Sequence, residues 1–80
     1  MKNPVKISNK KDDIYLFVYE YDKNENEYIQ LAFLKPNETT LLNIKPNTTI
    51  IFKNGKLINN LVYPDEIILQ TVVNQNFFIF

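Results

Sequence analysis

The chain contains no cysteine, no histidine and no tryptophan, and all nine of its basic residues are lysine. Without cysteine, neither a disulfide nor a thiolate metal site can support the fold. Without histidine, the chain lacks the commonest general base and the commonest metal ligand. A phosphate-binding loop needs several glycines, and this chain has one. We therefore expect a protein that is not an enzyme, with no catalytic residues, no metal ligands and no cofactor.

The charge and the hydropathy of the chain point to protein partners. Nine lysines balance nine acidic residues, whereas a nucleic-acid-binding surface or a polybasic membrane anchor needs an excess of basic residues. The longest apolar runs, such as residues 14–19, are too short to cross a bilayer as a helix. The first residues show no apolar signal segment. We expect an intracellular or virion location, no binding to nucleic acid or membrane, and a protein partner that is a second copy or another subunit.

Codon composition explains part of the amino-acid usage. Asparagine, isoleucine, lysine, phenylalanine and tyrosine supply 42 of the 80 residues, whereas glycine, alanine, arginine and proline together supply six. The first group has AT-rich codons and the second has GC-rich codons. An AT-rich genome, for instance that of a virus or phage, is the simplest explanation for this bias.

Short apolar segments separated by polar turns recur at intervals of about ten residues, which is typical of antiparallel strands. Residues 14–21 and 28–34 form the clearest pair, and the polar residues 22–27 would join them as a hairpin. A near-duplicate follows, in which residues 34–42 and 44–51 each place a Lys-Pro-Asn turn before a threonine-rich strand. Proline presets the first central position of a β-turn, and asparagine tolerates a positive φ at the next.

Further turns are predicted in the second half of the chain. Asn54-Gly55 is the strongest short hairpin signal, because both central residues of a type I′ turn need a positive φ. Residues 64–66 (Pro-Asp-Glu) predict another turn, followed by strands at residues 67–73 and 77–80. The sequence thus predicts one domain over residues 1–80. Its fold would be a small antiparallel all-β sandwich of about seven strands, immunoglobulin- or transthyretin-like or jelly-roll-like.

The strand at residues 14–21 is apolar on both of its faces. Because side chains alternate along a strand, Leu16 and Val18 share one face. The other face carries four aromatic rings, those of Tyr15, Phe17, Tyr19 and Tyr21. Two interpretations stay open: the rings are the half-buried outer face of a central strand, or they are a contact surface. Tyrosine is enriched at interfaces, and several adjoining rings make a patch large enough to attract a partner.

The C-terminal segment Phe77-Phe78-Ile79-Phe80 is unusually apolar. It predicts either a closing strand in the domain's own sheet or a strand added to the sheet of a neighbouring subunit. The candidate partner-binding residues are therefore Tyr15, Phe17, Tyr19, Tyr21, Tyr28, Phe77, Phe78 and Phe80.

Residues 22–26 match the first half of a calcium-binding loop, D-x-N-x-N. Glu27 stands where that loop needs glycine, and Phe33 stands where it needs the bidentate glutamate. The segment therefore predicts a solvated hairpin loop and no metal site.

One pattern runs through residues 5–9, the aromatic strand with Tyr19 and Asp22, then Tyr28, the turn at 34–36 and a strand that ends in Phe52. In this pattern, residues 5–57 resemble the β-domain of the von Hippel–Lindau protein family. The resemblance implies a small β-sandwich that binds a hydroxyproline-containing peptide, with Tyr19 and Tyr28 in the places of two pocket aromatics. This chain lacks the pocket histidine and both tryptophans of that family; Thr48 and Ile50 are the nearest equivalents.

Three classes of function are consistent with these features. The first is a non-enzymatic structural or assembly protein, for instance a small viral or phage component. It would make contacts through the aromatic strand face and the apolar C-terminal strand and would form a homo-oligomer or a larger assembly. The second is a monomeric recognition module or inhibitor that binds a peptide or protein. The third is a small-ligand or carbohydrate binder that uses the same tyrosines.

Overall fold

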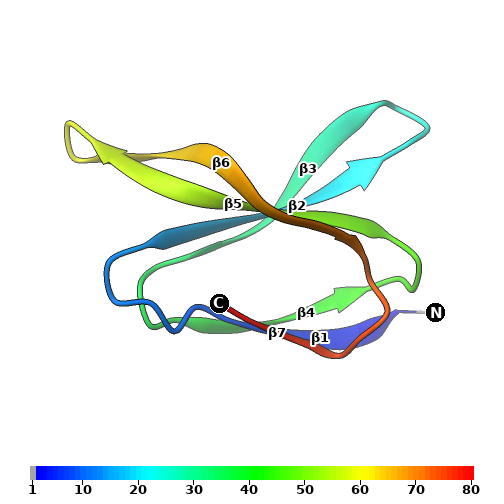
Figure 1. Ribbon diagram of the computed structural model, residues 1–80. Helices are drawn as coiled ribbons and strands as arrows, with labels where there is room; N and C mark the ends of the chain where they lie inside the picture. Colours follow the sequence, from blue (N-terminus) through cyan, green and yellow to red (C-terminus); the bar gives the residue numbers. More distant parts are fainter. Residues whose placement is uncertain (1) are drawn as a thin grey trace.

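In the computed structural model, which describes residues 2–80, the chain folds into seven strands (Figure 1). They are β1 (Asn3–Ser8), β2 (Tyr15–Asp22), β3 (Glu27–Leu34), β4 (Thr39–Ile44), β5 (Thr49–Ile58), β6 (Leu61–Val72) and β7 (Phe77–Ile79). Residues 2–80 contain no helix of the length and apolarity that a membrane crossing requires.

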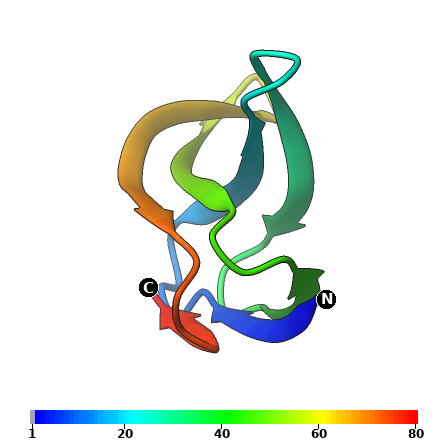
Figure 2. The same cartoon turned by 90° about the vertical axis from the view of Figure 1, so that its right-hand side faces the viewer.

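The strands form two facing sheets, which confirms the predicted all-β sandwich. The small sheet has the order β4-β1-β7 and the large sheet has the order β3-β2-β5-β6. All neighbours are antiparallel except β1 and β7, which are parallel. Figure 2 shows the small sheet below and the strongly twisted large sheet above it.

The main core lies between the two sheets. Phe52 of β5 is fully buried there, and its ring packs against the rings of Phe78 and Phe80, with centroid separations of 5.2 and 4.5 Å. Alternation along β2 directs Leu16 and Val18 into this core, as the sequence predicted. The other buried members of the core are Val5, Ile7, Leu34, Ile44, Ile50 and Val73.

The two Pro-Asn turns carry the chain from one sheet to the other. Asn37 and Asn47 adopt the predicted positive φ values, 62° and 66°. The amide of Glu38 donates to the carbonyl of Lys35 at 3.1 Å, as expected for a β-turn after Pro36. The strand between the two turns, β4, pairs with β1 instead of with β3 or β5. The duplicate therefore places β4 in the small sheet, although the strands before and after it in the chain, β3 and β5, belong to the large sheet.

The predicted hairpin turn at Asn54-Gly55 is wrong. Both residues lie inside β5, and the chain reverses four residues later, where Asn59 and Asn60 have φ values of 51° and 69°. Two adjacent asparagines thus supply the two positive φ values that a type I′ turn needs. Gly55 has a negative φ, so it is used for its small size and not for its backbone freedom.

The predicted turn at residues 64–66 is also wrong, since these residues lie within the continuous strand β6. The register of β5 and β6 shifts twice between Phe52 and Gly55, and Pro64 pairs with Gly55 beside the second shift. Proline is tolerated in a sheet at an edge strand or at a bulge, and β6 is an edge strand. The proline therefore marks an irregularity in the strand and not its end.

The side chain of Asn9, which is 1% exposed, joins the loop after β1 to the turn before β4. Its Nδ2 donates to the carbonyls of Ile14 at 2.7 Å and of Lys35 at 3.1 Å. Its Oδ1 accepts from the amide of Lys11 at 3.2 Å. One buried amide thus satisfies three backbone groups that no strand pairs, and the sequence alone did not single it out.

Replacement of Asn9 by aspartate is expected to destabilise the protein by about 1–3 kcal/mol, because a carboxylate at this buried position cannot donate to the carbonyls of Ile14 and Lys35. Chemical denaturation at neutral pH measures the change in the free energy of unfolding. Asn74→Asp is the matched control, because it adds the same charge at an exposed position. Equal stabilities of the two variants would contradict this role of Asn9.

Candidate protein-binding surfaces

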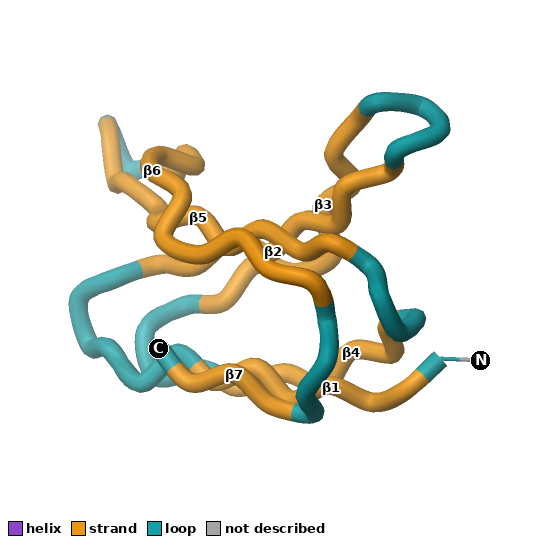
Figure 3. The backbone as a smooth tube through the Cα atoms, turned by 45° about the vertical axis from the view of Figure 1, so that its right-hand side comes forward, coloured by secondary structure: helices purple, strands orange, loops and turns teal. Residues whose placement is uncertain are grey.

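The large sheet extends beyond the small one as two projecting hairpins. Figure 1 shows that the β2–β3 and β5–β6 hairpins both rise on the side opposite the small sheet, and Figure 3 shows the same from another direction. The register explains the arrangement: Tyr15 pairs with Gly55, so β5 continues past the start of β2, and the β2–β3 hairpin continues past the start of β5. The outer face of the large sheet therefore lies between two raised ends.

The aromatic stripe of β2 forms a second, smaller core on this outer face. Phe17 is only 7% exposed, although it lies outside the cluster between the sheets. The ring of Phe33 packs against Phe17 and Tyr15, with centroid separations of 5.0 and 5.7 Å, and Tyr19 stacks on Phe17 at 6.3 Å. Tyr15, Tyr19 and Tyr21 are half-buried. We call the rings of Tyr15, Phe17, Tyr19 and Phe33 the outer aromatic cluster.

Gly55 allows the β5–β6 hairpin to close over this cluster. A Cβ atom at residue 55 would lie 2.7 Å from Cβ of Tyr15 and 2.9 Å from Cγ1 of Val62. It would also lie 3.1 Å from Cε2 of Phe17. Three side chains from β2 and β6 therefore converge on the one residue that has no side chain. The burial of Phe17 on an outward face depends on this approach.

A groove remains between the β5–β6 hairpin and β3. It has a volume of about 370 Å³, and Phe17 contributes to its lining. Phe33 and Gln30 of β3 line it from one side, and Leu61 and Val62 of β6, with Asn60, line it from the other. We call this the outer groove. It is apolar, with two side-chain amides that can bind polar groups of a partner.

Tyr28, another of the candidate partner-binding residues, lies at the far end of the β2–β3 hairpin. Its ring packs against Tyr21 with a centroid separation of 5.3 Å, and the hydroxyl of Tyr21 donates to Oδ1 of Asn26 at 2.7 Å. The ammonium of Lys53 lies 5.4 Å from the ring centroid of Tyr19 and 6.0 Å from that of Tyr28. These separations are typical of cation–π contacts. Tyr19 and Tyr28 are thus linked through one lysine.

The small sheet carries a second apolar surface, on its own outer face. Leu41, Phe77 and Ile79 are 65, 56 and 63% exposed. Lys6 pairs with both Leu41 and Phe77, so the lysine lies between these two residues in the sheet, and Ser8 pairs with Ile79 one row away. We call Leu41, Phe77 and Ile79 the small-sheet patch. A depression of about 470 Å³ lies beside Phe77 and Ile79 and is lined also by Lys6 and Lys10.

The C-terminal segment is divided between this patch and the core. It closes the domain's own sheet by pairing with β1, and the amide of Phe80 donates to the carbonyl of Ser8 at 2.9 Å. Phe78 is 6% exposed and belongs to the core, and Phe80 is half-buried against Phe52. Of the three predicted phenylalanines, only Phe77 is exposed to solvent; Phe78 is buried in the core and Phe80 packs against Phe52.

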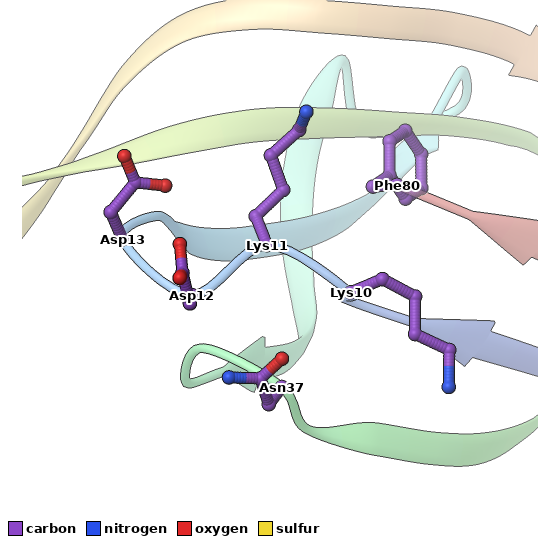
Figure 4. Close-up of a pocket in the computed structure, with 6 residues that line it drawn as sticks. All are labelled: Lys10, Lys11, Asp12, Asp13, Asn37 and Phe80. Carbon is purple, nitrogen blue, oxygen red and sulfur yellow. The ribbon is translucent and has the colours of Figure 1, made fainter.

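A depression at the loop after β1 does not bring reactive groups together. It has a volume of about 560 Å³ and lies beside Phe80 and the loop after β1. Figure 4 shows that the amines of Lys10 and Lys11 point in different directions and that the carboxylates of Asp12 and Asp13 lie apart from both. Within residues 2–80, no group of three potential metal-ligating side chains is found. In the 22–27 loop, Oδ1 of Asp22 accepts from the amide of Asn24 at 2.9 Å, which orders the turn.

No family model, no curated protein and no solved structure matches this chain. The resemblance to the von Hippel–Lindau β-domain therefore stays a prediction.

Several residues of the two surfaces were missed from the sequence. Leu41 and Ile79 alternate with buried or half-buried neighbours, so their exposure depends on which sheet their strands join. Phe33 is opposite Phe17 in the register of β2 and β3, and strand alternation within the predicted hairpin could have identified it. Leu61 and Val62 could not have been found, because the turn before them was predicted at the wrong place.

Replacement of Gly55 by alanine is expected to destabilise the protein by about 1–3 kcal/mol, because the methyl group overpacks the contact with Tyr15 and Val62. The sign is informative. Since residue 55 has a negative φ, the effect on the unfolded chain alone would stabilise the variant by about 0.4–1 kcal/mol. Chemical denaturation distinguishes the two, with Lys56→Ala as the neighbouring exposed control. A Gly55→Ala protein that is more stable than the parent would contradict the packing role of this residue.

Burial raises the pKa of the Tyr19 phenol above its ordinary value of 10.0. The folded state then holds this proton more tightly than the unfolded chain does, so stability is unaffected well below about pH 10 and falls as the pH rises through that value. Tyr19→Phe should reduce this fall, and Tyr63→Phe, which removes an exposed phenol, should reduce it less. Urea denaturation between about pH 8 and 11 measures how steeply the free energy of unfolding falls with pH for each variant. Identical slopes for the two variants would refute the effect of burial.

Proposed function

We propose that this protein is a non-enzymatic assembly component that binds other protein subunits through the small-sheet patch and the outer face of the large sheet. The observation that carries the proposal is the small-sheet patch, where Leu41, Phe77 and Ile79 are each more than half exposed on one face of one sheet. Single exposed apolar residues are ordinary on a protein surface, whereas several on one face of one sheet, here on either side of Lys6, favour an interaction site.

The arrangement of the patch supports contact across a face of the sheet. Its side chains belong to β4 and β7, the two edge strands of the small sheet, and the aliphatic stem of Lys6 lies between them. A partner could bury all three apolar side chains while the lysine ammonium remains at the rim, as is common in interfaces. The AT-rich composition makes a virus or phage the setting that we favour for such a component.

The second candidate is a recognition module that binds a peptide, and the outer groove favours it. Two apolar walls, Phe33 and Leu61, are accompanied by the side-chain amides of Gln30 and Asn60, which could bind the backbone of an extended segment. The hydroxyproline peptide implied by the family resemblance would instead bind at Tyr19 and Tyr28. It would have to displace Lys53 from both rings. A carbohydrate site ranks third, because the tyrosines of the stripe pack against other rings.

A photoreactive side chain at the small-sheet patch tests the proposal in the organism that encodes the chain. Benzoyl-phenylalanine in place of Phe77 is expected to give specific covalent adducts with one or a few proteins on irradiation. The same group in place of Tyr63, which is similarly exposed and outside both surfaces, is expected to give none of them. Mass spectrometry identifies the adducts. Adducts at position 77 no more abundant than those at position 63 would refute an interface at the small-sheet patch.

A further inference from the structure

The net charge of zero conceals a separation of charge between two layers. The small-sheet layer, residues 2–13, 35–48 and 73–80, holds six lysines and three acidic residues, a charge of +3. The large-sheet layer, residues 14–34 and 49–72, holds three lysines and six acidic residues, a charge of −3. The molecule therefore has a basic side and an acidic side, and they coincide with the two sheets.

The acidic excess lies entirely on the β2–β3 hairpin. Lysines and acidic residues are equal in number along residues 49–72, so the β5–β6 hairpin is neutral. Residues 14–34 carry one lysine, Lys23, against Glu20, Asp22, Glu25 and Glu27. This hairpin projects away from the small sheet (Figure 1), and Glu25 and Glu27 are exposed at its end.

Each charged side also carries one of the two apolar surfaces. The small-sheet patch is crossed by Lys6 and lies beside Lys10, and both lysines are exposed. The outer groove lies on the opposite side of the sandwich, between the neutral hairpin and the strand β3 of the acidic one. The lining of the outer groove is itself uncharged, and the acidic residues Glu25 and Glu27 lie further along the β2–β3 hairpin. The basic layer and the acidic layer thus each carry an apolar surface, and these surfaces lie on opposite sides of the molecule.

We propose that the partner of the small-sheet patch is the hairpin side of a second copy of this chain, so that copies associate head to tail. This inference rests on the proposed function and names its partner. A two-fold dimer would pair each surface with itself and bring charges of the same sign together, whereas a head-to-tail contact pairs +3 with −3. Each bound copy keeps one free surface of each kind, so the association continues into a filament or closes into a ring.

Contact between faces is favoured over addition of a strand to β7. The side chain of Gln75 donates from Nε2 to the carbonyl of Phe77 at 2.7 Å. Residues 76 and 80 direct their backbone bonds toward β1, so in a parallel pair the carbonyl of Phe77 points to the free edge. Gln75 therefore occupies an acceptor that an added strand would need, while the side chains of Phe77 and Ile79 stay exposed on the face.

Sedimentation velocity of the purified full-length chain over a range of concentrations tests the inference. Species heavier than the 9.5 kDa monomer are expected at low ionic strength. Their fraction should decrease as salt screens the opposite charges. Ile79→Ser, within the patch, should weaken association. Ile68→Ser, outside the patch at a residue that is 45% exposed and lines a pocket with Asn9 and Phe80, should not.

Two charge-reversed variants give the decisive measurement. Glu25→Lys with Glu27→Lys makes the hairpin side basic, and Lys6→Glu with Lys10→Glu makes the small-sheet side acidic. The dissociation constant for self-association of each variant alone should rise about tenfold or more, because both sides of the molecule then carry net charge of the same sign. An equimolar mixture should associate again, because the basic hairpins of one variant face the acidic small sheets of the other. Circular dichroism confirms that both variants are folded.

The outcomes separate this inference from the proposed function. Restored association in the mixture supports head-to-tail contact between copies. If either charge-reversed variant alone associates as the parent does, the head-to-tail inference is overturned. It is also overturned if the mixture of the two variants does not associate. A chain that stays monomeric at every concentration also overturns it, yet the proposed function would stand if position 77 still cross-links to a different protein.

Discussion

The close approach of the β5–β6 hairpin to β2 at Gly55 is the contact on which the character of the large sheet depends. Atoms of Tyr15, Phe17 and Val62 all lie within van der Waals distance of the position that a Cβ atom at residue 55 would occupy. Because the hairpin can close there, Phe17 is buried on a face that would otherwise meet solvent, and the remaining space becomes the outer groove. The outer groove, one of the two surfaces that we propose for binding, is therefore a consequence of packing around one glycine.

The small sheet depends on a different division of apolar side chains. The parallel pairing of β7 with β1 directs Phe78 inward toward Phe52 and leaves Phe77 and Ile79 outward. A chain of this length has few residues for its core, and here alternate residues of one short strand serve the core and the outer face. The same pairing places Lys6, one of the six lysines of that layer, within the apolar patch.

Local turn signals were reliable where no packing contact competed with them. Asn37 and Asn47 follow proline in exposed turns, and both adopt the predicted backbone conformation. The Asn54-Gly55 signal failed because a distant contact, the one with Tyr15, required a residue without a side chain at this point of a strand. Pro64 failed as a turn signal because it occupies a bulge in an edge strand, where its missing amide proton is tolerated.

The amino-acid sequence by itself determined the positions of most strands, the face of β2 that enters the core, and the absence of histidine and cysteine. These properties follow from alternation, backbone preference and composition, which are local. Tertiary structure alone decided which sheet β4 and β7 join, that Phe17 is buried and Phe77 exposed, and that the charges separate between two layers. Those properties depend on contacts between residues far apart in the chain, and no local pattern encodes which strands will meet.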